Sequence, residues 1–190
     1  VACAEAGNPD RPFKFASTSK VTFPGAGISG FAASPANVAD AKARMNAQTI
    51  GHDKLNQLRH VKFLRDGQGI AEHMAKHAQI LRPKFDCVVE CLGEGLSEVG
   101  ECSWSNPRGG YFVSFDAPAG TAKRIVALAK EAGVTMTGAG ATYPYKQDPN
   151  DSNIRIAPTL PPLEELKEAM DVFVTCVKLA YVESLLAQRA

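Results

Sequence analysis

A short apolar segment that opens into a polar, glycine-rich loop is the feature that most restricts how this chain can fold. Residues 13–16 are typical of the end of a β-strand, and Ser17-Thr-Ser-Lys20 follows directly. A glycine-rich segment at 23–30 comes next. Strand ends that open into such loops often carry functional residues. We therefore expect a site at this loop.

Three helical patterns follow the loop. The first begins at Ser34-Pro35 and runs to about Gln48, with proline at the first helical position. The second covers residues 53–64 and has an apolar stripe at steps of three, formed by Leu55, Leu58, Val61 and Leu64. The third runs from Ile70 to about Leu92, and Pro83 within it predicts a kink or a boundary. We interpret this third helix as a connector between two lobes.

The remainder of the chain mixes strands and helices. The predicted strands are residues 111–115, 134–137 and 153–157. The predicted helices are 121–132, ended by Gly133, and a long C-terminal helix that follows Pro161-Pro162. A polar, turn-rich loop at 138–152 separates two of the strands, and loops of this length in compact domains are usually functional. The sequence from Gly67 onward therefore predicts an α+β domain.

The charge balance and hydropathy argue against two classes of partner. Lysine and arginine number 21 against 20 aspartates and glutamates, so a net charge of +1 provides no broad field to attract nucleic acid. The most apolar segment, 173–186, carries Lys178 and Glu183 and falls short of the roughly 18 uncharged residues that a membrane span needs. We expect a soluble protein that binds neither nucleic acid nor membrane.

Cysteine and histidine pairs raise the possibility of a metal site. Cys87 and Cys91, like His73 and His77, are four residues apart and would share a helix face. No second ligand pair follows the cysteines at zinc spacing, and the glutamate of a zinc protease is absent between the histidines. Small buried thiols and a solvated helix face are the favoured interpretations, so we expect no metal. Five cysteines, an odd number without regular spacing, indicate reduced thiols in the cytoplasm.

Two basic residues are the candidates for chemistry. Lys20 follows small hydroxyl residues at a strand end, where partial desolvation would lower the pKa of its amine and make it a nucleophile able to form a Schiff base. Ser17 and Ser19 could donate hydroxyl groups to a phosphate. Strand alternation places Ile154 and Ile156 on one face and Arg155 on the other, where a planar guanidinium could bind a carboxylate. The competing interpretations are a solvated loop lysine and a solvent-facing arginine on an edge strand.

The order of these motifs resembles a known family. The motifs are Ser17-Thr-Ser-Lys20 followed by Phe23-Pro-Gly25, then Gln48-Thr-Ile-Gly-x-Asp-Lys-x-Asn-Gln-Leu-Arg59, Asn106-Pro-Arg-Gly-Gly-Tyr-Phe112 and Asn153-Ile-Arg-Ile156. Together they look like the C-terminal half of a fold-type I, pyridoxal-phosphate (PLP) dependent aminotransferase of class I/II, in the aspartate-aminotransferase-like subgroup. The resemblance covers nearly the whole chain.

The resemblance implies an α/β fold of the PLP-dependent transferase type I. Residues 1–66 would be the end of the large cofactor-binding domain, and residues 67–190 a small C-terminal domain with its connecting helix. Lys20 would form the Schiff base with PLP, Ser17 and Ser19 would bind its phosphate, and Arg155 would bind the substrate α-carboxylate. The reaction would move an amino group from an amino acid, aspartate, to a 2-oxo acid, 2-oxoglutarate, in a cytoplasmic homodimer.

The sequence departs from the family in two places. Most relatives have a phosphate-binding arginine seven or eight positions after the lysine, where this chain has Gly27 and Ile28. A backbone nest in residues 25–27 or a residue of a partner chain would have to replace it. The residues that contact the pyridinium ring lie well upstream of the lysine in relatives, and only 19 residues precede Lys20 here. We therefore expect the chain, which begins at Val1 without an initiator Met, to be a portion of a longer enzyme.

Two other functions remain open on the same scaffold. One is a non-catalytic regulatory or interaction domain that has kept the aminotransferase fold, an alternative that the missing phosphate arginine keeps open. The other is a different PLP reaction, a β-elimination or a decarboxylation, because a fold does not fix the reaction.

Overall fold

The computed structural model describes residues 1–189, and the chain divides into two compact units. Unit 1 is Val1–Ala78, and unit 2 begins at Gln79 and takes in the rest of the chain. The chain passes from one to the other inside a single helix, α4 (Gly67–Gly95). The predicted domain boundary at 66/67 falls at the start of this helix and stays a prediction.

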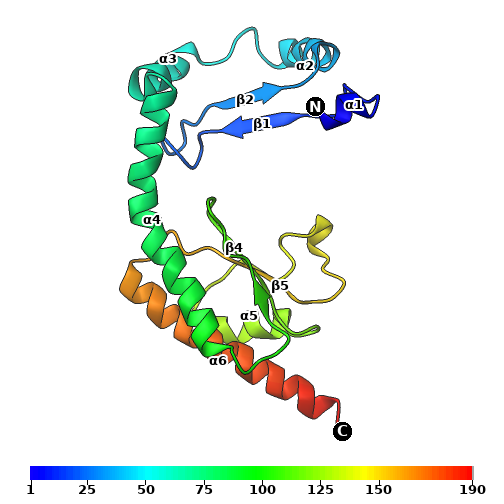
Figure 1. The fold of residues 1–190 in the computed structure, drawn as a ribbon, viewed down its shortest axis with the longest axis vertical. Helices are drawn as coiled ribbons and strands as arrows, with labels where there is room; N and C mark the ends of the chain where they lie inside the picture. Colours follow the sequence, from blue (N-terminus) through cyan, green and yellow to red (C-terminus); the bar gives the residue numbers. More distant parts are fainter. Residues whose placement is uncertain (190) are drawn as a thin grey trace. The chain divides into compact units, whose positions relative to one another are not determined.

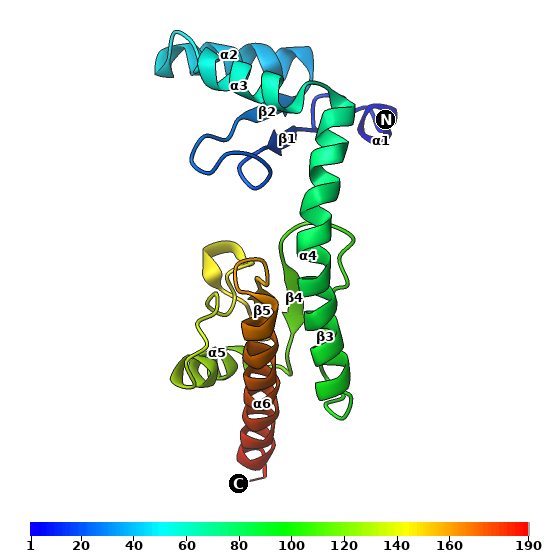
Figure 2. The same ribbon diagram turned by 90° about the vertical axis from the view of Figure 1, so that its left-hand side faces the viewer.

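Unit 1 is built on a two-stranded antiparallel ribbon. Strand β1 (Lys14–Ser17) pairs with β2 (Ser29–Ala32), and the last pair of the ladder is Ser17 with Ser29. Helix α1 (Ala2–Glu5) precedes the ribbon, while α2 (Pro35–Gln48) and α3 (Lys54–Leu64) follow it. Both α2 and α3 lie on the same side of the ribbon (Figure 1 and Figure 2). The strand end and the two helices predicted for this part of the chain are confirmed.

The side chains that precede α2 and α3 explain where these helices begin. The hydroxyl of Ser34 accepts a hydrogen bond from the Asn37 amide at 3.4 Å, and the Asp53 carboxylate accepts one from the Asn56 amide at 2.9 Å. Each bond satisfies an amide of the first turn that has no partner within the helix.

Unit 1 has little interior of its own. Its buried residues are His60, Leu64 and Gly69. Three of the four members of the apolar stripe of α3, Leu55, Leu58 and Val61, are exposed, and only Leu64 is buried. The helix instead turns a face with steps of four toward the loop between β1 and β2, and this face contains Asn56, His60 and Leu64.

Helix α4 runs without interruption past Pro83. It starts at Gly67, where the Asp66 carboxylate accepts a hydrogen bond from the Gly69 amide at 2.8 Å. The structure therefore confirms the predicted long helix but shows no helix break at Pro83. A short link at Arg65-Asp66 separates α4 from α3.

Unit 2 contains a three-stranded antiparallel sheet in the order β3-β4-β5. The strands are β3 (Ser103–Trp104), β4 (Val113–Asp116) and β5 (Asn153–Ile156). Helix α5 (Ala122–Glu131), the 3-10 helix η1 (Pro144–Lys146) and helix α6 (Leu163–Ala187) complete the unit. The predicted strands at 111–115 and 153–157, the helix at 121–132 and the C-terminal helix are confirmed within a few residues.

The predicted strand at 134–137 is wrong. The Val134 amide donates to the Ala129 carbonyl at 2.8 Å and the Gly133 amide donates to the Lys130 carbonyl at 3.1 Å. These bonds cap the C-terminus of α5, and Gly133 has the positive φ of 91° that such caps favour. The edge of β4 that faces away from β5 is taken by β3, a strand that the sequence analysis did not predict.

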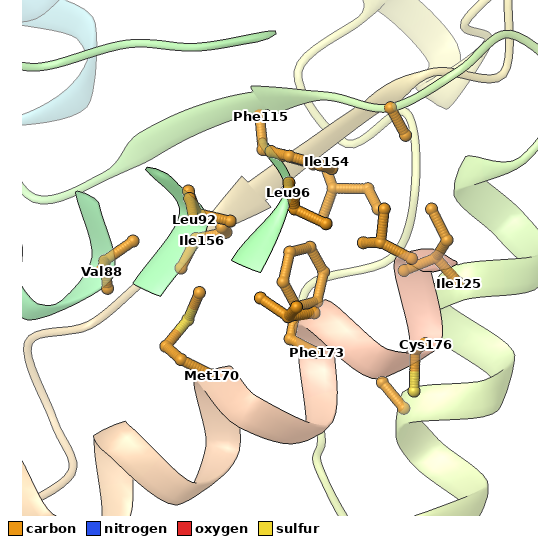
Figure 3. Packing of buried hydrophobic residues seen from close by; sticks show 14 of the residues in the cluster. Val88, Leu92, Leu96, Phe115, Ile125, Ile154, Ile156, Met170, Phe173 and Cys176 are labelled. Atoms are coloured by element: carbon orange, nitrogen blue, oxygen red, sulfur yellow. The ribbon is translucent and has the colours of Figure 1, made fainter. Parts of the chain in front are cut away.

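The hydrophobic core of unit 2 joins the sheet to α4, α5 and α6. Figure 3 shows the packing of this core. The rings of Phe115 and Phe173 meet edge to face with centroids 5.2 Å apart. Alternation along β5 buries Ile154 and Ile156 in this core, as predicted. Other members of the core are Val88, Leu92, Leu96, Ile125, Met170 and Val177.

Candidate active site

The predicted site at the end of β1 is a loop closed at its base, which we call the lysine loop (residues 18–28). The Thr18 amide donates to the Ile28 carbonyl at 2.9 Å, and the Ile28 amide donates to the Thr18 hydroxyl at 2.9 Å. These two bonds continue the pairing of β1 and β2 by one step. They fix the two ends of the loop that carries Lys20.

The hydroxyl groups of Ser17 and Ser19 lie together beside the loop. Their Oγ atoms are 2.7 Å apart, and the Ser19 amide donates to Ser17 Oγ at 3.2 Å. Gly27 packs closely against Ser19, since a Cβ at that position would lie 2.9 Å from Ser19 Oγ and 3.0 Å from Ser19 Cα. Only glycine fits such an approach without a shift of the backbone. The result is a small cradle of hydroxyls and backbone suited to a phosphate.

Lys20 lies in the turn that follows Ser19, and its side chain is exposed. The expected backbone nest at residues 25–27 loses one donor, because the Ala26 amide donates to the Phe23 carbonyl within the loop at 3.1 Å. Gly25, at a φ of 73°, makes that turn possible.

A buried histidine, which the sequence analysis did not single out, contacts the lysine loop from α3. His60 is 1% exposed, and its Nε2 lies 2.7 Å from Thr22 Oγ1 and 3.2 Å from Thr18 Oγ1. Its Nδ1 lies 2.9 Å from the Asn56 carbonyl oxygen one turn earlier in the same helix. The repeat of Asn56, His60 and Leu64 at steps of four was the sequence signal for this contact.

A second histidine contacts the loop from α4. His73 Nε2 donates at 2.6 Å to the carbonyl of Val21, the residue after Lys20. The His73 ring is 4.6 Å from that of His77, but residues 1–189 contain no group of three side chains placed to bind a metal.

The five cysteines are free thiols. None of the helices in residues 1–189 is long and apolar enough to cross a membrane.

A cleft of about 1240 Å³ in unit 1 lies beside the lysine loop. Its walls are largely apolar and come from the β1–β2 ribbon and from α2 and α3, with Phe15, Phe31 and Met45 among them. Ser17 and Gly27 also line it, whereas Lys20 and Ser19 are not among its lining residues. The cleft is therefore an apolar surface next to the hydroxyl cradle rather than a pocket around the lysine.

Arg155 belongs to unit 2, where it lies on β5 opposite Ser114 of β4. Its side chain is half-buried, and its Cζ lies 4.4 Å from the centroid of the Phe112 ring. Its Nε is buried and has no hydrogen-bond partner in the described part of the chain. A guanidinium stacked on a ring with an unused buried donor is well suited to bind a planar anion.

The loop before β5 is held by one carboxylate. Asp148 accepts hydrogen bonds from the amides of Asn150, Ser152 and Asn153 at 3.0, 2.8 and 2.8 Å. These backbone donors, with that of Asn153 the strongest, hold the pKa of Asp148 below its usual value. The carboxylate thereby orders the chain that enters the strand of Arg155.

Comparison with known proteins identifies the class. A solved structure of an aspartate transaminase from Corynebacterium glutamicum has a TM-score of 0.90 and 48% identity to this chain, and the match covers 95% of this chain and 43% of that one. The α-aminoadipate aminotransferase LysN from Thermus thermophilus, solved with N-(5'-phosphopyridoxyl)-L-leucine, has the same fold at a TM-score of 0.77 and 21% identity over 95% of this chain and 45% of its own. The fold is that of the PLP-dependent aminotransferases, as the motifs predicted.

The family follows from the sequence itself. Residues 1–189 match the family described as aspartate amino-transferase, and the chain belongs to that family. An aspartate aminotransferase of Corynebacterium glutamicum is 49% identical over 178 residues, which are 94% of this chain and 41% of that protein. The chain thus spans about two fifths of the length of the curated relatives that it matches.

Proposed function

We propose that this chain is the C-terminal portion of a PLP-dependent aminotransferase and that Lys20 is its cofactor-binding lysine. The residues present fit the cofactor: the cradle of Ser17, Ser19 and Gly27 offers hydroxyls to a phosphate, and the exposed Lys20 follows it directly. Family membership over residues 1–189 supports the same assignment. Asp10 lies too near Lys20 in sequence to serve as the partner of the pyridinium nitrogen, so we assign that role to no residue of this chain.

Each residue would have a distinct task. PLP, when bound, supplies an electron sink for the electron pair left on the substrate Cα after its proton is removed. Lys20 would hold the cofactor through Nζ in the absence of substrate. As a free amine, it would take the proton from the substrate Cα and deliver it to C4′ of the cofactor. Arg155 would bind the α-carboxylate through its planar guanidinium and so orient the Cα–H bond.

We further propose that the amino donor is aspartate and the acceptor 2-oxoglutarate, and that the intact enzyme is a cytoplasmic homodimer. The name of the Corynebacterium glutamicum relative at 49% identity supports the choice of aspartate. An assay of the intact enzyme with this pair should yield oxaloacetate. Turnover of a different amino acid in place of aspartate would reject the substrate but leave the reaction class intact.

The observation that carries the proposal is the close approach of Gly27 to Ser19, whose hydroxyl pairs with that of Ser17 next to Lys20. Borohydride reduction of the intact enzyme, followed by peptide mapping, should place a pyridoxyl group on Lys20. Full cofactor occupancy with an unmodified Lys20 would overturn the assignment. A protein that binds no PLP at all would favour a non-catalytic domain with the aminotransferase fold.

A further inference from the structure

His60 is the one buried side chain of unit 1 that can both donate and accept hydrogen bonds. A buried polar ring must have partners, since an unsatisfied polar group costs about 1–3 kcal/mol. All its hydrogen-bond partners belong either to its own helix or to the lysine loop. The ring therefore links α3 to that loop.

The partners of the two ring nitrogens define the tautomer. Nδ1 lies 2.9 Å from the carbonyl oxygen of Asn56, which can only accept, so Nδ1 carries the proton. In the neutral ring, Nε2 is then an acceptor, and the Thr22 hydroxyl donates to it at 2.7 Å. The hydroxyl of Thr18 lies 3.2 Å from the same nitrogen.

The two threonines stand two residues before and two residues after Lys20. Thr18 also accepts the Ile28 amide and so ties the base of the loop, while the Val21 carbonyl accepts from His73 of α4. One imidazole nitrogen therefore lies against hydroxyl groups on both sides of Lys20. Thr22 donates to it, whereas the Thr18 hydroxyl also lies 3.3 Å from the Ile28 carbonyl and can donate there.

An aromatic contact supports the same arrangement. The Phe23 ring meets the edge of His60 with centroids 5.2 Å apart and an interplanar angle of 78°. It lies 5.1 Å from the ring of Phe63 on α3. Phe23 thus anchors the segment after Lys20 to the same helix as His60. The hydrogen bonds of His60 then set the orientation of the turn that carries Lys20.

We propose that His60 is a positioning residue for the cofactor-binding lysine. Its Nε2 accepts from Thr22 and contacts Thr18, so that the turn between the two threonines presents Lys20 in one orientation. This inference rests on the role proposed above for Lys20. Without the Nε2 acceptor the turn has several orientations, and only some molecules present Lys20 in the orientation that binds PLP. The apparent affinity for PLP falls in proportion to the fraction of molecules in that orientation.

Two substitutions of similar size separate the two ring nitrogens. His60→Gln places an amide oxygen near the position of Nε2, where it can still accept from Thr22. His60→Asn reaches only the position of Nδ1 and can still donate to the Asn56 carbonyl. It therefore removes the acceptor for the Thr22 hydroxyl, whose remaining partner is the Thr18 carbonyl at 3.3 Å. The measurement is the dissociation constant of PLP from the apo form of the intact enzyme, followed by the visible absorption of the bound cofactor.

We expect His60→Gln to bind PLP within about threefold of the unmodified enzyme and His60→Asn to bind about tenfold more weakly or worse, from the loss of a buried hydrogen bond. Thr22→Val should reproduce the loss and Thr22→Ser should not. The combined His60→Asn and Thr22→Val enzyme should lose less than the product of the single effects, because both remove one interaction. Thr175→Val, which removes an exposed hydroxyl bonded within α6 at 2.9 Å, is the matched control.

Equal PLP affinity for the Gln and Asn variants, whether both match the unmodified enzyme or both fall, would overturn the inference, because the ring would then act only by its bulk. The Thr22 pair tests the same interaction independently if the His60 variants do not fold. Lys20→Ala separates this inference from the proposed function. If it leaves the visible absorption of the bound cofactor unchanged, the role of Lys20 itself is wrong.

Discussion

The guanidinium of Arg155 stacks on the ring of Phe112, with Cζ 4.4 Å from the ring centroid. The two residues come from segments more than 40 positions apart that antiparallel pairing of β4 and β5 brings together. The ring covers one face of the guanidinium and leaves the donors at its edge for an anion. Phe112 is 42% exposed, so the stack is open to solvent.

Replacing Arg155 by Ala in the intact enzyme should lower kcat/KM for amino acids by about 100-fold or more, because two charge-assisted hydrogen bonds of about 1.5–3 kcal/mol each are lost. Arg155→Lys should retain part of the activity, since it keeps the charge but lacks the planar fork. Arg124→Ala is the control, because Arg124 pairs with Glu183 at 2.7 Å on the surface of unit 2. Steady-state kinetics that showed equal losses at both arginines would contradict the assignment.

Gly95 and Gly93 provide a matched pair at the end of α4. A Cβ on Gly95 would lie 2.6 Å from Cγ1 of Val174 on α6, whereas nothing lies within 4 Å of one on Gly93. Gly95→Ala should destabilise unit 2 by about 1–3 kcal/mol through overpacking, and Gly93→Ala should stabilise it by about 0.5–1 kcal/mol. Hydrogen exchange of the α4 and α6 amides, measured by mass spectrometry, checks both.

Combining Gly95→Ala with Val174→Ala should recover much of the lost protection, because the smaller side chain makes room for the new methyl group. The close contact would not be the cause of the loss if the double variant were as unstable as the sum of the two single variants.

Asp148 should make the order of its loop depend on pH. Its pKa is lowered in the folded state, so its contribution to stability is present above the ordinary carboxyl value of about 3.9 and is lost as the pH falls through the lower folded value. Asp148→Asn should show reduced protection of the Ser152 and Asn153 amides at pH 7 in hydrogen exchange. Asp86→Asn, at an exposed carboxylate of α4, should leave them unchanged. Protection in the Asp148→Asn variant equal to that of the original chain would refute this role.

Cys91 and Cys102 should react slowly with alkylating agents. Burial, followed by the neighbouring Cys87 thiol, raises the pKa of Cys91 to about 11, and burial, followed by Glu101, raises the pKa of Cys102 to about 11. At pH 8 only about one thiol in a thousand is then ionised, so iodoacetamide should label Cys102 on the order of 100-fold more slowly than the same residue in a short peptide. Mass spectrometry of labelled peptides measures the two rates.

The same shifts have a consequence for stability. Well below the ordinary thiol pKa of about 8.5 these thiols are protonated in both the folded and unfolded states, whereas between that value and about 11 the unfolded chain loses its protons first. Stability should therefore fall over that range, and less so in a Cys102→Ala variant. The measurement is the free energy of unfolding by denaturant as a function of pH. The same slope against pH in the original chain and in the Cys102→Ala variant would argue against burial of the Cys102 thiol.

The sequence predicts the structural role of a residue correctly where that role depends only on its neighbours along the chain. Ser34 and Asp53 cap the helices that follow them, and the alternation of Ile154 and Ile156 buries one face of β5. Such patterns depend only on spacing along the chain.

The errors arise where tertiary contacts override that spacing. Val134 has the composition of a strand, but its amide is used to cap α5. The leucine stripe of α3 has helical spacing, but the lysine loop packs against the face of His60 instead. The repeat of Asn56, His60 and Leu64 at steps of four indicates a shared helix face, but only the fold shows that His60 on this face meets Thr18 and Thr22.

The β1–β2 ribbon has a consequence for the life of this polypeptide in a cell. Each strand has one edge that no other strand in residues 1–189 pairs with, and Phe15 on β1 is 77% exposed. Open strand edges beside exposed aromatic rings are templates for misassembly, and a two-stranded ribbon is marginally stable by itself. Chaperones bind and proteases degrade chains that expose such surfaces. Residues 1–78 made on their own should therefore be degraded faster than unit 2.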